Sequence, residues 1–163
     1  MGRRCFYSFH YANDSWRVST VKGIGTVEGQ PLVSGNQWEE VERGGDRSIQ
    51  RWIDDQMKGR SCLIVLIGSA TAGRRWVNYE IEKAWNDGKG VLGIHIHNLL
   101  DRYGYTSAKG SNPFARFTVG QQPLSNWAKT YDPPFTDSKQ VYANIAGNIE
   151  SWIESAIKLR NGG

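Results

Sequence analysis

The sequence predicts an α/β domain in which a parallel sheet carries helices on both faces, spanning residues 1–163. Apolar runs of strand length alternate along the chain with segments of helical periodicity, which is the pattern of such a fold. The clearest run, residues 62–67, is apolar at every position, as expected for a strand buried on both faces. The length of 163 residues, with 39% hydrophobic and 22% charged residues, fits one globular domain.

The first predicted elements are a strand and a helix near the N-terminus. Residues 5–9 form a short apolar and aromatic run that suits a buried strand. Asp14 or Ser15 is expected to cap the helix that follows. Residues 24–45 are rich in glycine and polar side chains, and they predict loop with a short strand near residues 31–33.

The middle of the chain contains the clearest periodic signals. An apolar stripe at i, i+3, i+4 and i+8 predicts a helix and is formed by Ile49, Trp52, Ile53 and Met57. Residues 62–67 then form the central strand, residues 76–87 a helix, and residues 91–96 a second buried strand.

The last third of the chain is less regular. Residues 98–138 show no sustained periodicity and predict a long irregular segment. Such segments are often functional, and one hypothesis is that this one shields or completes the ligand cleft. Residues 139–160 show helical periodicity and predict a C-terminal helix.

The alternation of strands and helices also predicts where a ligand binds. In open parallel sheets the site lies outside the carboxyl ends of the strands, where the strand order switches. If the order is flavodoxin-like, residues 8–14 and 68–80 wall the site. Cys5 and Cys62 then lie on adjacent strands, as buried reduced thiols.

Composition and motif content argue against several classes of function. The net charge of +4 is too modest to indicate nucleic-acid binding. No run approaches the roughly 18 apolar residues of a membrane helix, so we expect a cytoplasmic protein. His95, His97 and His10 lack a carboxylate or thiol to complete a set of ligands, so no metal site is expected. The phosphate-binding glycine loops of kinases and dehydrogenases are missing from the sequence.

Carboxylate, aromatic and basic side chains converge on the predicted cleft. Trp76 and Glu80 are four residues apart and share one helix face, close to the end of the central strand. Arg74 precedes that helix and is a candidate phosphate ligand. The end of the first strand supplies four further candidate substrate-binding residues, Ser8, Phe9, His10 and Tyr11. Aromatic rings, an arginine and one carboxylate suit a phosphate-bearing small molecule with a planar base.

Five motifs resemble those of a known family. They are residues 4–11, 66–69, 75–81, 93–96 and 110–114, in order and at the expected spacing. Together they resemble the TIR-like proteins of the bacterial Thoeris antiphage defence system. The resemblance covers most of residues 4–114, whereas residues 115–163 match poorly beyond a terminal helix.

The resemblance implies a flavodoxin-like, doubly wound sheet and an enzyme that cleaves NAD at the nicotinamide–ribose bond. NAD is then a substrate, and no cofactor is implied. The Trp-x-x-x-Glu motif of TIR enzymes maps onto Trp76 and Glu80, which makes Glu80 the catalytic residue. In such relatives ADP-ribose is cyclised to a signalling nucleotide that activates a separate effector after a phage-derived trigger. Self-association is compatible with the family, and the loop that completes the site in some TIR assemblies falls near residues 34–43.

Two other classes of function stay open from the sequence. Many TIR domains act only as interaction or adaptor modules, without enzymatic activity. A nucleoside deoxyribosyltransferase is a different N-glycosyl enzyme on the same architecture. The sequence also leaves open whether water or the substrate itself captures the ribosyl cation, and therefore whether the product is linear or cyclic.

Overall fold

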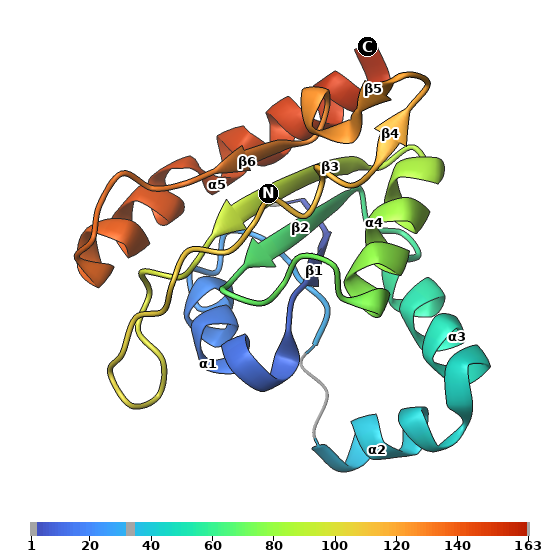
Figure 1. Ribbon diagram of the computed structural model, residues 1–163, viewed down its shortest axis with the longest axis horizontal. Helices are drawn as coiled ribbons and strands as arrows, with labels where there is room; N and C mark the ends of the chain where they lie inside the picture. Colours follow the sequence, from blue (N-terminus) through green and yellow to red (C-terminus); the bar gives the residue numbers. More distant parts are fainter. Residues whose placement is uncertain (1–2, 32–34, 163) are drawn as a thin grey trace.

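The computed structural model of the protein describes residues 3–31 and 35–162. Its centre is a four-stranded parallel sheet in the order β1-β2-β3-β6 (Figure 1). The strands are β1 (Cys5–Ser8), β2 (Cys62–Ile67), β3 (Gly90–His95) and β6 (Lys129–Tyr131). The predicted parallel α/β fold is therefore confirmed.

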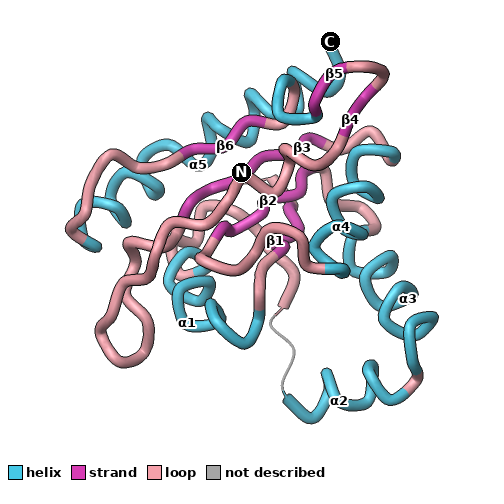
Figure 2. The backbone as a smooth tube through the Cα atoms, viewed as in Figure 1, coloured by secondary structure: helices cyan, strands magenta, loops and turns pink. Residues whose placement is uncertain are grey.

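Helices cover both faces of this sheet (Figure 2). One face packs against α1 (Tyr11–Lys22) and α5 (Ser138–Gly162). The other packs against α3 (Gly45–Met57) and α4 (Arg75–Asn86), and α2 (Gly35–Arg43) packs on α3. No helix within residues 3–31 and 35–162 combines the length and the apolar composition that crossing a membrane requires.

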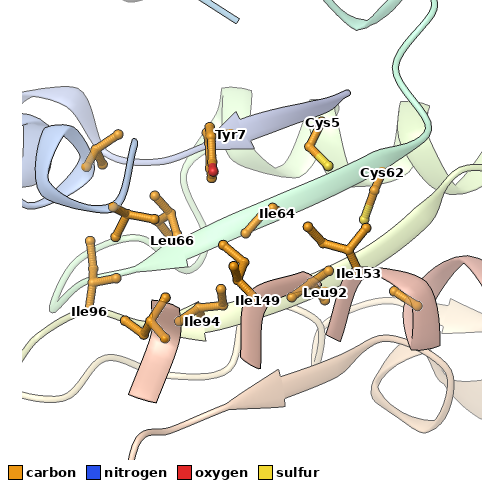
Figure 3. Close-up of a cluster of buried hydrophobic side chains, with 14 of the residues drawn as sticks. Cys5, Tyr7, Cys62, Ile64, Leu66, Leu92, Ile94, Ile96, Ile149 and Ile153 are labelled. Carbon is orange, nitrogen blue, oxygen red and sulfur yellow. The ribbon is translucent and has the colours of Figure 1, made fainter. Parts of the chain in front are cut away.

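The side-chain alternation of the strands divides the core into two clusters. In β2, Cys62, Ile64 and Leu66 point toward α1 and α5, while the intervening residues point toward α3 and α4. Figure 3 shows the first cluster, in which the isoleucines of α5 pack on the sheet. Cys5 and Cys62 are paired in register on adjacent strands, and both are buried, free thiols. This is the arrangement expected from the sequence.

The edge of the sheet beside β1 is completed without a full strand. Glu28 forms an isolated parallel bridge with Arg4 and accepts a hydrogen bond from the Cys5 amide at 2.8 Å. The Gln30 side chain extends this pairing, since its amide exchanges two 2.8 Å hydrogen bonds with the Tyr7 backbone. The predicted short strand fell at residues 31–33, of which residues 32–33 lie outside the described residues. If the segment at Glu28 is counted as the second strand along the chain, it lies at the edge beside β1. The strand order of the sheet then follows the flavodoxin pattern.

The first helix begins earlier than its capping residues predicted. It starts at Tyr11, with His10 at the N-cap position. Asp14 is inside the first turn and buried, where it accepts a 3.0 Å hydrogen bond from Arg17. A buried carboxylate needs such a partner, and this ion pair explains why Asp14 is not a solvent-exposed cap.

Two predicted loops contain regular structure. The polar stretch 24–45 includes α2, and the irregular segment 98–138 includes β6, which pairs with Leu92–Ile94 at the edge of the sheet. The latter segment also holds a small hairpin, β4 (Thr118–Val119) with β5 (Gln122–Pro123), and the 3-10 turn η1 (Leu124–Asn126). The sequence did not predict α2 or β6, because each of them is short and carries few apolar residues.

Candidate functional site

A cavity of about 850 Å³ opens at the carboxyl end of β1, between the sheet, α2, α3 and α4. This is the position at which open parallel sheets bind ligands. The volume lies within the usual range of small-molecule sites. Its lining includes the following aromatic, polar and charged residues: Phe6, Phe9, His10, Tyr11, Gln30, Trp38, Glu42, Trp52, Arg74, Arg75, Trp76 and Glu80.

Glu80 is a buried carboxyl on the wall of this cavity. It projects from α4, and its side chain is one of the few charged groups excluded from water. Ser8, at the last position of β1, donates a 2.6 Å hydrogen bond to Glu80 Oε1. Burial raises the pKa of Glu80 to about 8, and the hydrogen bond from Ser8 opposes that rise. Glu80 is therefore largely protonated at neutral pH when the cavity holds no cation.

The other candidate residues occupy two kinds of position. Phe9, His10, Tyr11, Arg74 and Trp76 line the cavity together with Glu80. Ser8 does not belong to the lining; its hydroxyl faces Glu80 and is buried. Ser8 therefore contacts Glu80 and not the space of the cavity.

The entrance of the cavity is basic and aromatic. Partial burial lowers the pKa of His10, and the positive charge of Arg74 lowers it further, so both favour the neutral imidazole. Arg75 stacks on Trp76, with 4.7 Å between the guanidinium carbon and the ring centroid, and pairs with Asp46 of α3. Arg74 is exposed and forms no ion pair with the described residues, so its guanidinium is available to a phosphate.

Two direct contacts join α3 to α4 on this side of the cavity. The Tyr79 hydroxyl donates a 2.8 Å hydrogen bond to Asp54. The Arg75–Asp46 ion pair forms the second link. Both helices also pack on the sheet, so the wall that carries Glu80 is held by the core as well as by these polar contacts.

The resemblance placed residues 34–43 near a site, but sequence reasoning assigned no role to the side chains of α2 and did not expect α3 in the lining. Trp38 and Glu42 come from α2, and Trp52 comes from α3. Their signal was present in the sequence, because Trp38 and Glu42 repeat the four-residue spacing of Trp76 and Glu80. The hypothesis that residues 98–138 complete the cleft is not supported, since none of the described residues of that segment lines the cavity.

The histidines considered for a metal lie away from this cavity, except for His10. His95 and His97 are buried beside each other, with ring centroids 5.7 Å apart in an edge-to-face arrangement. Burial lowers the pKa of both imidazoles. Across residues 3–31 and 35–162, no three His, Cys, Asp or Glu side chains are grouped so as to hold a metal ion.

Comparison with known proteins agrees with the fold and the motifs. The model of the family described as "Thoeris protein ThsB, TIR-like domain" matches residues 6–101. A protein of Bacillus cereus (strain MSX-D12), named "Putative cyclic ADP-D-ribose synthase ThsB1", is 37% identical over 119 residues. That match covers 70% of this chain and 62% of the relative, so the chain spans less than two thirds of the relative's length.

The matched region contains the parts from which the cavity is built. Residues 6–101 include the end of β1, helices α1 to α4 and strands β2 and β3. The resemblance identified from five short motifs is thereby confirmed over more than half of the sequence. The chain belongs to the TIR-like ThsB family of Thoeris proteins.

Proposed function

We propose that the protein cleaves NAD at the nicotinamide–ribose bond and cyclises the resulting ADP-ribose into a signalling nucleotide. The observation that carries this proposal is the buried Glu80 carboxyl, hydrogen-bonded to Ser8, on the wall of a large aromatic cavity. The name of the Bacillus cereus relative, "Putative cyclic ADP-D-ribose synthase ThsB1", supports the same chemistry.

One carboxylate is sufficient for this reaction. Nicotinamide in NAD is cationic, so it leaves as a neutral molecule with the electron pair of the broken C–N bond and needs no added proton. The ribose then develops oxocarbenium character, as in O-glycoside cleavage. Glu80, in its ionised form, stabilises that cation and holds the ribose hydroxyls. A preorganised contact of this kind contributes about 3 to 4 kcal/mol, or roughly 10²–10³ in rate.

Binding of a cationic substrate also favours the ionised form of Glu80. An adjacent positive charge favours the ionised form of a carboxyl and lowers its pKa. The positive nicotinamide ring therefore displaces the proton that burial retains on Glu80 in the free protein. Substrate binding is expected to release a proton below about pH 8.

The second step determines the product. Attack on C1′ of the ADP-ribosyl cation by a nitrogen of its own adenine, which then loses a proton, forms a cyclic nucleotide that contains one water less than ADP-ribose. Attack by water instead forms linear ADP-ribose. We assign the cyclic route because the cavity is large enough to enclose both ends of a folded dinucleotide.

In the cell, the cyclic product is proposed to activate a separate antiphage effector after a phage-derived trigger. Membership of the Thoeris family supports this role. The trigger acts before the nucleotide signal and the effector responds to that signal, so the chemistry can be observed in an infected cell extract without the effector.

The test compares wild type with Glu80→Gln in bacteria challenged with a panel of phages. Mass spectrometry of the small molecules should detect a cyclic ADP-ribose isomer only with wild type, because the amide cannot offset the positive charge on the ribose. Glu82→Gln, which changes an exposed carboxyl on the same helix, is the matched control and should retain product. Equal product from wild type and Glu80→Gln would remove Glu80 from the chemistry, and the same product in cells with an empty vector would favour a non-enzymatic interaction module.

A further inference from the structure

Helix α2 presents a second Trp-x-x-x-Glu pair to the cavity. Trp38 and Glu42 are four residues apart, so they share one face of the helix. Both line the same cavity as Trp76 and Glu80, which have the same spacing on α4. The cavity therefore carries one tryptophan and one carboxyl from each of two helices.

The ring of Trp38 belongs to an aromatic chain that begins in the core. Phe6 of β1 packs edge to face with Trp52, with centroids 6.5 Å apart and an interplanar angle of 67°. Trp52 packs in the same manner with Trp38, at 5.5 Å and 75°. In such a T-shaped pair, the edge of one ring packs against a face of the other ring. The two faces of the first ring are therefore not covered by its partner. The pair thus offers an aromatic face to a planar base.

Glu42 supplies the polar part of this surface. Its side chain is exposed and lies on the cavity wall one helical turn beyond Trp38. A carboxylate accepts hydrogen bonds from vicinal ribose hydroxyls, which is how acidic residues select NAD in dinucleotide-binding folds. The same negative charge repels a phosphate attached to the ribose 2′ position.

We propose that Trp38 and Glu42 form a nucleoside subsite for the adenosine half of the substrate, in the cavity that Glu80 also lines. The adenine stacks on the Trp38–Trp52 pair, and the adenosine ribose donates hydrogen bonds to Glu42. This subsite rests on the proposed function for its orientation, since Glu80 then holds the ribose of the nicotinamide half. It makes the protein selective for NAD over NADP.

The subsite also explains how the dinucleotide is folded. With its two nucleosides on α2 and α4 of one cavity, the substrate bends so that adenine approaches the ribose carbon that loses nicotinamide. Holding reacting groups close together in this way is a large part of the advantage of intramolecular reactions.

Binding of the separate halves of the substrate tests the subsite without turnover. In the Glu80→Gln chain, the affinities for AMP and for nicotinamide mononucleotide are measured by calorimetry. Adding Trp38→Ala should weaken AMP binding about tenfold, because a base stacked on an aromatic ring is lost. Binding of nicotinamide mononucleotide should stay within about twofold, because its site lies at residue 80.

Two variants separate stacking from a general loss of structure. Trp38→Phe keeps an aromatic face and should restore most of the AMP affinity. Trp16→Ala removes an exposed tryptophan of α1 that does not line the cavity, and should leave AMP binding unchanged. AMP affinity within about twofold of the parent in Trp38→Ala, or an equal loss in Trp16→Ala, would overturn the subsite.

Glu42 is tested with adenosine 2′,5′-bisphosphate, which carries the phosphate that distinguishes NADP. Glu42→Gln removes the negative charge at nearly constant shape, so the bisphosphate should bind at least threefold more tightly while AMP binding changes little. Glu39→Gln, on the same helix but outside the cavity lining, is the matched control. Unchanged discrimination in Glu42→Gln would remove Glu42 from the subsite.

The binding test of the subsite and the test of NAD cleavage can succeed or fail separately. If wild type releases no nicotinamide but AMP binding depends on Trp38, the subsite stands and NAD cleavage is rejected. If wild type releases nicotinamide but AMP binding ignores Trp38, NAD cleavage stands and the subsite is rejected.

Discussion

Burial of Glu80 lowers the stability of the protein and also places a carboxyl with a raised pKa at the cavity. Its carboxyl is buried beside the cavity, and burial raises its pKa to about 8. The only side-chain hydrogen bond that favours its ionised form comes, within the described residues, from Ser8. Perturbed acids of this kind concentrate at functional sites, because a protein gains nothing in stability from burying a lone carboxyl.

The pH dependence of the reaction follows from this pKa. If ionised Glu80 stabilises the ribosyl cation, kcat/KM should rise with pH and level off above about pH 8, the pKa of the free protein. Initial rates of nicotinamide release across the neutral and alkaline range give this profile in a triggered extract. A rate that falls above pH 8 would instead assign Glu80 the role of a proton donor.

Ser8→Ala provides the control for this assignment. The hydrogen bond from Ser8 lowers the pKa of Glu80, so its removal should shift the rising limb to higher pH. The variant should lose activity at neutral pH and recover much of it in alkaline solution. A loss of rate that is equal at every pH would indicate that Ser8 affects the structure of the site rather than the ionisation of Glu80.

At the scale of elements, the packing of α5 depends on how closely this helix approaches the sheet. Gly90 opens β3 where α5 passes over it, and a Cβ built there would lie 2.8 Å from the Ile157 backbone nitrogen. Backbone atoms of a packed helix cannot yield as a flexible side chain does. The glycine therefore sets the distance between α5 and the sheet.

Two glycine-to-alanine substitutions should have opposite effects on stability. Gly90→Ala should destabilise the protein by about 1 to 3 kcal/mol, because it overpacks the contact between β3 and α5. Gly147→Ala, in the exposed interior of α5 with no atom within 4 Å of the added Cβ, should stabilise it by about 0.5 to 1 kcal/mol. Urea unfolding of the two variants measures both changes. A stabilising Gly90→Ala would show that α5 adjusts its position on the sheet.

At the scale of the whole molecule, the two faces of the sheet differ. Helices cover one face completely, whereas the other face is covered partly by helices and partly borders the cavity. Helix α5 and helix α1 bury the first face, where the residues of β2 and β3 are fully covered. On the second face, α3 and α4 bury the strands, and α2 packs on α3 and contributes to the cavity lining. The site therefore lies where the helical layer ends.

Global stability should depend on pH through Glu80. Its pKa is 4.5 when unfolded and about 8 when folded, so the folded state binds the proton more tightly and loses stability as pH rises between these values. Glu80→Gln removes this loss and should be more stable than wild type at pH 7, by at most about 3 kcal/mol. The difference should shrink as pH falls toward 4.5.

Thermal or urea unfolding of both chains across this pH range measures the difference. Glu82→Gln should behave as wild type, because Glu82 is exposed. A constant difference between Glu80→Gln and wild type at all pH values would show that Glu80 does not titrate with a raised pKa in the folded protein.

The sequence by itself determined the elements that bury long apolar runs, and the residues attached to them. The strand over residues 62–67 was predicted with its observed limits, because six consecutive apolar residues admit few alternatives. The helix carrying Trp76 and Glu80 was predicted within one residue at each end. Local spacing was enough here, since helix geometry alone puts residues four apart on one face.

Only the tertiary structure decided the elements and contacts that depend on distant partners. β6 is a strand because Leu92–Ile94 supplies its hydrogen bonds, and α2 is a helix whose apolar residues pack on α3. The same is true of the site: burial of Glu80 and its bond to Ser8, 72 positions away in sequence, arise from packing of α4 on β2 and β3, which brings Glu80 to the end of β1. Local sequence sets periodicity, whereas burial, pKa and the shape of a cavity are properties of residues brought together by the fold.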